Sequence, residues 1–156
     1  MNIEESNLFM NYSIFLKNLA IRVFDNLGPG HNEKIYHKAL KTELDCYGIL
    51  SDVERHVAVT YIDSKGNYHC LESERIDLFI HSNTNEWSGI VNVICELKAI
   101  SKNIGEQERV QVRKYFNELK KHNVDCKYGI IINFPQPSSK EVKTEIEFEV
   151  IKNTIS

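Results

Sequence analysis

Residues 91–100, with the sequence VNVICELKAI, decide how the rest of the chain is interpreted. Glu96 and Lys98 interrupt a run that is otherwise almost wholly apolar. Side chains on a strand alternate between its faces, so Glu96 and Lys98 point to one side and their apolar neighbours to the other, toward a core. Burying a charge is costly unless it is paired or bound to a metal. The pattern therefore favours a site in which the carboxylate holds a divalent cation and the lysine orients water or stabilises negative charge.

A purely structural interpretation of this pair stays open at this point. Glu and Lys two residues apart also occur on the solvated face of antiparallel strands, where they form a weak ion pair. The other polar residues of the chain are needed to decide between the two interpretations.

The composition is that of an ordinary globular protein. The 156 residues are 42% hydrophobic and 26% charged, which predicts a single domain over residues 1–156 with a substantial core. The formal net charge of −3 argues against a protein that coats nucleic acid without specificity. It leaves room for a local basic patch.

The cysteines, histidines and hydropathy pattern indicate a soluble intracellular protein. None of the four cysteines lies in a CxxC pair or at zinc spacing, so we expect free thiols in a reducing compartment. The six histidines form no metal-binding pattern, and we interpret them as surface or packing residues. No apolar run approaches the ~20 residues of a membrane span. The first residues lack the basic start of a secretion signal.

Hydrophobic periodicity predicts an α/β fold. The expected order is two helices, three strands, a helix and two strands, which gives a mixed sheet made of an antiparallel meander and a helical crossover. The expected helices cover residues 11–27, 31–47 and 106–122, and the expected strands cover residues 53–62, 68–80, 90–100, 126–134 and 142–151. A turn at 63–67 and a polar loop at 81–89 join the first three strands.

Two further carboxylates stand where core residues are expected. Asp77 lies on the strand before Glu96, and a meander brings the two side by side, where they repel each other unless a cation lies between them. An ion pair of Asp77 with Arg75 or Lys98 is the alternative. Glu33 begins the apolar stripe of the second helix, and stabilisation by the helix dipole is its alternative explanation.

The helix at 106–122 carries the other candidates. Gln111 and Tyr115 are spaced i, i+4 and so share one face of the helix. Arg109, Arg113 and Lys114 belong to the densest basic segment of an acidic protein. This segment is either a solvated face or the place where a polyanion binds.

In order along the chain, these residues form a recognisable set of motifs. The segments are GHNEKIY at 30–36, which reads G-x-x-E-x-x-Y, then RID at 75–77, ICELKA at 94–99, QVRKY at 111–115 and GIIINF at 129–134. The set resembles the GxxExxY family, a branch of the PD-(D/E)XK nuclease superfamily, over roughly residues 28–134. Ile76 stands where the family pattern has proline, and the loop at 81–89 is long.

The resemblance implies an αβββαβ restriction-endonuclease-like core, with a mixed central sheet flanked by helices. It also assigns roles to the polar residues. Asp77, Glu96 and the backbone carbonyl of Leu97 would hold Mg²⁺, for which Mn²⁺ can substitute, with Glu33 supporting the metal site. Lys98 would orient water or stabilise the transition state. Substrate contacts would come from the third helix, through Gln111, Tyr115, Arg109, Arg113 and Lys114.

The function that the sequence predicts is therefore metal-dependent hydrolysis of phosphodiester bonds in nucleic acid, with DNA expected in preference to RNA. A homodimer is one arrangement by which such an enzyme reaches two strands. The first alternative is a non-catalytic module that binds nucleic acid or a partner on a nuclease-like fold. The second is a structural protein whose charges form only ion pairs, which metal binding would distinguish.

Overall fold

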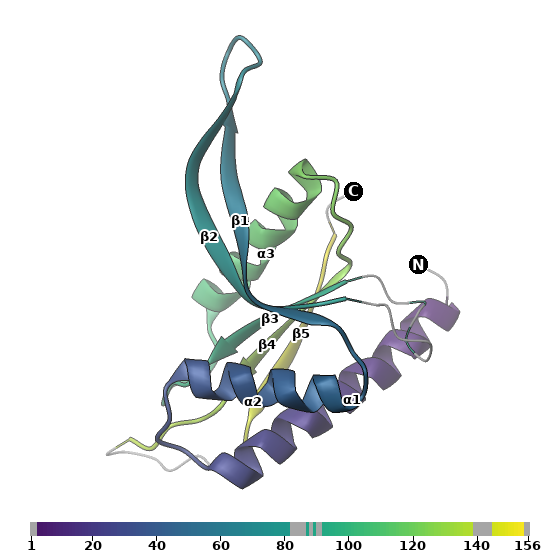
Figure 1. Ribbon diagram of the computed structural model, residues 1–156, viewed down its shortest axis with the longest axis vertical. Helices are drawn as coiled ribbons and strands as arrows, with labels where there is room; N and C mark the ends of the chain where they lie inside the picture. The colour runs from purple at the N-terminus through teal and green to yellow at the C-terminus, as the bar shows by residue number, and fades with distance from the viewer. Residues whose placement is uncertain (1–2, 82–86, 88, 90–91, 139–144, 155–156) are drawn as a thin grey trace.

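The computed structural model describes residues 3–81, 87, 89, 92–138 and 145–154. Its helices and strands follow the predicted order (Figure 1). The elements are α1 (Ile3–Leu27), α2 (Glu33–Cys46), β1 (Ser51–Ile62), β2 (Tyr68–Ile80), β3 (Val93–Lys98), α3 (Glu106–Lys121), β4 (Tyr128–Asn133) and β5 (Glu147–Lys152).

The five strands form one mixed sheet, with the strands side by side in chain order. β1, β2 and β3 are antiparallel neighbours, β3 and β4 are parallel, and β5 returns antiparallel to β4. A parallel pair needs a crossover connection, and α3 provides it. The predicted mixed α/β architecture is confirmed.

Helices cover both faces of this sheet (Figure 1). α1 and α2 pack on one face, where Cys95 and Leu97 of β3 lie in their core. α3 packs on the other face, where Ile94 of β3 is fully buried beneath it. The sequence suggested only one core-facing side for β3, but both sides are covered. The solvated-face interpretation of Glu96 and Lys98 is therefore wrong for Glu96, which is 5% exposed.

β2 leaves β3 soon after the two strands pair, and this separation positions the site. β1 and β2 are the longest strands, and their outer halves form a hairpin that projects from the body (Figure 1). β2 pairs with β3 only from Leu78 to Ile80. Asp77 is the first residue of β2 beyond this ladder, so its side chain lies where the two strands part.

α2 begins at a well-defined turn. Gly28 has a φ of 69°, a left-handed conformation that favours glycine and ends α1. Asn32 caps α2 by accepting a hydrogen bond from the Ile35 N–H (3.3 Å). The buried Tyr36 donates its hydroxyl to the Gly28 carbonyl (2.8 Å), which fixes the turn against the helix.

Several element boundaries differ from the predicted ones. α1 starts eight residues before position 11, because Phe9 is buried and its ring stacks on Tyr128 at 3.4 Å between centroids. Tyr47 was expected on the apolar face of the second helix, but the helix ends at Cys46 and Tyr47 is 58% exposed. The start of the predicted strand at 90–100 and that of the strand at 142–151 fall partly outside the described residues.

Within the described ranges, no helix is long and apolar enough to span a membrane.

Candidate active site

Asp77 occupies the point where β2 and β3 separate. Its Oδ2 accepts a hydrogen bond from the Leu97 N–H at 2.8 Å, in the place of the next backbone rung of the ladder. Burial is the largest influence on this carboxyl and raises its pKa, although the Leu97 N–H and the Lys98 charge act in the opposite direction. The fold thus holds a carboxylate fixed but poorly solvated.

Glu96 lies beside Asp77 and is more deeply buried. Its Oε1 is 3.5 Å from the Lys98 ammonium, while its Oε2 is buried without a hydrogen-bond partner among the described residues. Burial and then the charge of Asp77 raise the pKa of Glu96 to about 8. Two crowded carboxyls with too little positive charge around them are the situation that a bound cation relieves.

Among the residues that the structure describes, Lys98 is the only cation that forms an ion pair with Glu96. Burial alone would lower the pKa of Lys98, but the charges of Glu96, Glu33 and Asp77 raise it overall. The side chain is therefore an ammonium that donates hydrogen bonds rather than a base.

The alternative ion pairs of Asp77 are not found. Arg75 pairs with Glu54 at 3.5 Å, and Lys98 pairs with Glu96. The group nearest to Asp77 among the described ion pairs is instead a histidine, His37.

The structure brings Glu33 into the electrostatic surroundings of the site. Its charge raises the pKa of both Glu96 and Lys98. Glu33 also lies in the first turn of α2, where the helix dipole stabilises a negative charge.

Gln111 and Tyr115 lie on the α3 face of the sheet and approach the strand that carries Asp77. The Gln111 amide contacts Glu74 at 3.4 Å, and the Tyr115 hydroxyl donates to the Arg75 carbonyl at 2.6 Å. Burial and then the Glu96 charge raise the pKa of Tyr115. Both side chains are thus held by β2, through residues two and three positions before the metal-binding candidate Asp77.

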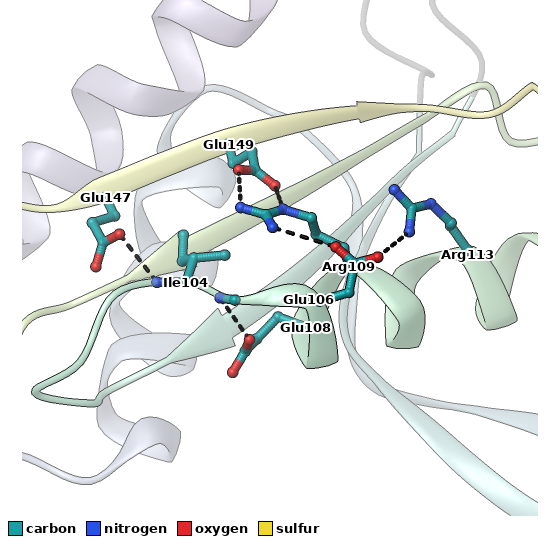
Figure 2. A network of polar contacts seen from close by, with 8 residues as sticks. Ile104, Glu106, Glu108, Arg109, Arg113, Glu147 and Glu149 are labelled. Atoms are coloured by element: carbon teal, nitrogen blue, oxygen red, sulfur yellow. Dashed lines mark hydrogen bonds and ion pairs between the residues drawn. The ribbon is translucent and has the colours of Figure 1, made fainter.

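The three basic residues expected to bind substrate are each paired with a carboxylate. Arg109 makes a two-pronged contact with Glu149 (2.7 and 3.0 Å) and also reaches Glu106 (3.4 Å). Arg113 bonds Glu106 at 2.8 Å, as Figure 2 shows. Lys114 pairs with Glu74. A phosphate would have to displace these carboxylates.

His37 is a residue of the site that the sequence interpretation missed. It is 4% exposed, and its Nε2 lies 3.9 Å from the Asp77 Oδ2. Burial is the main influence on its pKa and lowers it, which favours the neutral imidazole. A signal existed, because His37 follows Glu33 by one helical turn and lies on the apolar stripe with Tyr36 and Leu40.

A cleft of about 260 Å³ opens beside His37. Its lining includes Lys34 and Lys38 of α2, for which the described residues supply no ion-pair partner. Glu54 of β1 also lines it and has a φ of 55°, an uncommon backbone conformation for a residue with a side chain. No local pattern in the sequence marks Glu54, because its position depends on pairing with β2.

The donors around Asp77 suit a divalent cation. Carboxylate oxygens are the ligands that Mg²⁺ and Mn²⁺ prefer, and one oxygen of Glu96 is buried with no hydrogen-bond partner in the described part of the chain. Among the residues that the structure describes, no three His, Cys, Asp or Glu side chains are already arranged to hold an ion. Loading the site therefore requires side-chain adjustment around Asp77 and Glu96.

Comparison with known proteins agrees with this geometry. A family model described as the PD-(D/E)XK nuclease superfamily matches residues 11–145. A solved structure, the crystal structure of SSO0001, resembles the chain with a TM-score of 0.50 and 14% identity, over 79% of this chain and 50% of that one. This chain thus spans half the length of that protein, and the likeness concerns the fold. No curated protein sequence matches. The chain, a five-stranded mixed α/β protein with a restriction-endonuclease-like fold, belongs to the PD-(D/E)XK nuclease superfamily.

Proposed function

We propose that the protein is a metal-dependent nuclease of the GxxExxY type that hydrolyses phosphodiester bonds in nucleic acid, with DNA as the expected substrate. The observation that carries the proposal is the pair Asp77 and Glu96. Glu96 is buried and Asp77 is half-buried beside Lys98, both carboxyls have raised pKa values, and one oxygen of Glu96 has no hydrogen-bond partner among the described residues. Membership of a superfamily of hydrolytic nucleases supports this interpretation.

In this proposal Asp77, Glu96 and the Leu97 carbonyl hold the cation, with Glu33 adding negative charge from α2. Mg²⁺ or Mn²⁺ bound there supplies Lewis acidity toward water and neutralises charge on the phosphate. The Leu97 N–H fixes Asp77 in place, so one ligand is oriented before the cation arrives.

Lys98 then acts as a fixed positive charge. Its ammonium lies 3.5 Å from Glu96 in the absence of substrate, and it is close enough to the pair to donate hydrogen bonds to an attacking water or to a phosphate oxygen. Gln111 is the further polar group assigned to substrate or water, and Tyr115 supports it from the same helix face.

The free cations beside the site favour a particular path for the nucleic acid. Lys34 and Lys38 flank the cleft at His37, whereas Arg109, Arg113 and Lys114 are occupied by carboxylates. We therefore assign the first phosphate contacts to Lys34 and Lys38. The α3 cations can contribute only after their ion pairs rearrange.

The test is cleavage of labelled single- and double-stranded DNA and RNA during titration with Mg²⁺ and Mn²⁺. Wild type is compared with Glu96→Ala and with Glu72→Ala, a control at an exposed position of β2. We expect metal-dependent cleavage that is lost in Glu96→Ala and kept in Glu72→Ala. Binding of metal and nucleic acid without cleavage would instead support a non-catalytic module, and cleavage by Glu96→Ala would contradict the assigned site.

A further inference from the structure

We propose that His37 is a further protein ligand of the divalent cation and gives the site a preference for Mn²⁺ over Mg²⁺. The imidazole approaches Asp77 from α2, on the side of the cleft. This inference rests on the proposed function, because it concerns the same cation.

The first support is the unsatisfied imidazole. His37 is 4% exposed, and neither ring nitrogen has a hydrogen-bond partner among the described residues. A buried polar side chain normally finds a partner, and a group left without one costs free energy. A ring that is merely packed in the core needs no position beside a carboxylate, and this one lies beside Asp77.

The second support is the distance to Asp77. The His37 Nε2 and the Asp77 Oδ2 are 3.9 Å apart, which is too far for a hydrogen bond. Two donors that each bind one ion at about 2.1 Å lie about 3.0 Å apart at a right angle and about 4.2 Å apart when opposite. The observed separation falls within this range, so one ion can bridge the two atoms.

The groups that face the ring also fit a cation at this position. Glu33 and Glu54 contribute negative charge on the α2 and β1 sides, and Lys34 and Lys98 contribute positive charge. The ring itself forms part of the wall of the cleft, which gives an ion a path from solvent. The side-chain adjustment needed is that Glu96 turns from Lys98 toward the ion and the imidazole closes on it.

An imidazole ligand has a consequence for metal choice. Mg²⁺ binds oxygen donors and keeps several waters, whereas nitrogen donors suit the transition metals better. A site with two carboxylates and His37 therefore discriminates between Mn²⁺ and Mg²⁺, which a site of oxygen donors does only weakly. Removing the imidazole is expected to weaken Mn²⁺ binding at least tenfold and to change Mg²⁺ binding less.

The direct test is pulsed EPR of the Mn²⁺-loaded full chain, which detects nitrogen bound to manganese. We expect a ¹⁴N coupling in wild type that changes to a ¹⁵N coupling when histidine is ¹⁵N-labelled. The coupling should be absent from His37→Gln and present in His122→Gln, an exposed control on the far end of α3. Calorimetric titration with each metal should show the loss of Mn²⁺ preference in His37→Gln alone.

The outcomes separate this inference from the proposed function. Manganese that binds wild type without any nitrogen coupling, or a coupling that persists in His37→Gln, overturns the role of His37 and leaves the carboxylate site standing. The wild-type measurement decides this even if His37→Gln does not fold. Failure of wild type to bind either metal overturns both proposals.

Discussion

Acidic side chains gather in two regions of this protein, and only one region neutralises them. Between α3 and β5, Glu106, Glu147 and Glu149 meet Arg109, Arg113 and backbone N–H groups (Figure 2). At the separation of β2 and β3, the Lys98 ammonium is the only charge of a described residue that lowers the pKa values of both Asp77 and Glu96. In the first region the charges are balanced and stabilise the fold. In the second region the negative charge of two carboxylates exceeds the positive charge around them, and a bound cation can balance it.

The same contrast appears in the pKa values. Hydrogen bonds from Arg113 and Arg109 lower the pKa of Glu106, as expected for a carboxylate with partners. Burial raises the pKa values of both Asp77 and Glu96, and the charge of Asp77 raises that of Glu96 further. Groups whose pKa values are displaced in this way cluster at functional sites, and the four predictions below test whether the two regions differ as described.

The largest expected effect is on catalysis. Lys98→Ala removes the ammonium beside Glu96 and should lower metal-dependent cleavage at least a hundredfold while the fold is retained. The measurement is single-turnover cleavage in Mn²⁺, together with circular dichroism. Lys152→Ala, an exposed position on β5, is the matched control and should cleave like wild type. Normal cleavage by Lys98→Ala would remove Lys98 from the mechanism.

A change in the neutralised region should act on stability. Asn133 is fully buried and its amide bonds Ile100, Lys102 and Glu147. Asn133→Ala leaves these groups unpaired and should lower the free energy of unfolding by about 2–4 kcal/mol, measured by urea denaturation. A loss below 0.5 kcal/mol, on the order of an ordinary surface substitution, would show that this region is not a stabilising network.

At Glu96, removal of the charge is expected to raise the free energy of unfolding rather than lower it. Its pKa rises from an ordinary 4.5 to about 8 in the folded protein, so between these values the folded state binds more protons than the unfolded state. Stability therefore falls as pH rises through that window. Without metal, the free energy of unfolding of Glu96→Gln should exceed that of wild type by about 1–3 kcal/mol at pH 8 and should differ little from it near pH 4.5.

Urea denaturation in EDTA at the two pH values measures this difference. Glu72→Gln serves as the exposed control, and its free energy of unfolding should equal that of wild type at both pH values. A Glu96→Gln protein that is less stable than wild type at pH 8 would mean that Glu96 is a satisfied structural carboxylate.

The smallest expected effect concerns nucleic-acid binding. Lys34→Ala combined with Lys38→Ala removes two unpaired charges and should reduce the slope of log K against log salt by about 2 for duplex DNA. Arg113→Ala, whose charge is already paired with Glu106, should leave the slope close to that of wild type. Binding is measured by fluorescence anisotropy in EDTA. A slope that is reduced in Arg113→Ala but unchanged in the double lysine variant would contradict this assignment and place the phosphate contacts on α3.

The sequence predicted the buried carboxylates because their anomaly is local. Alternation on β3 places Glu96 and Lys98 together, and the meander brings Asp77 beside them, as the structure confirms. The hydrophobic periodicity of each segment likewise predicts the order of helices and strands, and the mixed sheet follows from that order.

The rest depends on long-range pairing that no local pattern records. Arg109 pairs with Glu149 of β5, 40 residues further along the chain, and Lys114 pairs with Glu74 of β2, 40 residues earlier. A basic helix that resembled a polyanion site is therefore largely neutralised. Glu54 reaches the site only through the register of β1 with β2. His37 was within reach of prediction, since it stands on the apolar stripe of α2.

The central claim is that the Asp77–Glu96 pair needs more positive charge than Lys98 provides, and that a bound metal ion supplies it. Thermal unfolding of wild type, Glu96→Gln and Glu106→Gln with and without Mn²⁺ tests it directly. At a hundred times the dissociation constant, Mn²⁺ should stabilise wild type by about 2.7 kcal/mol, which raises Tm by roughly 5–10 °C. Glu106→Gln, in the neutralised region, should respond like wild type, and Glu96→Gln should not respond. No shift in wild type, or an equal shift in Glu96→Gln, would contradict the account.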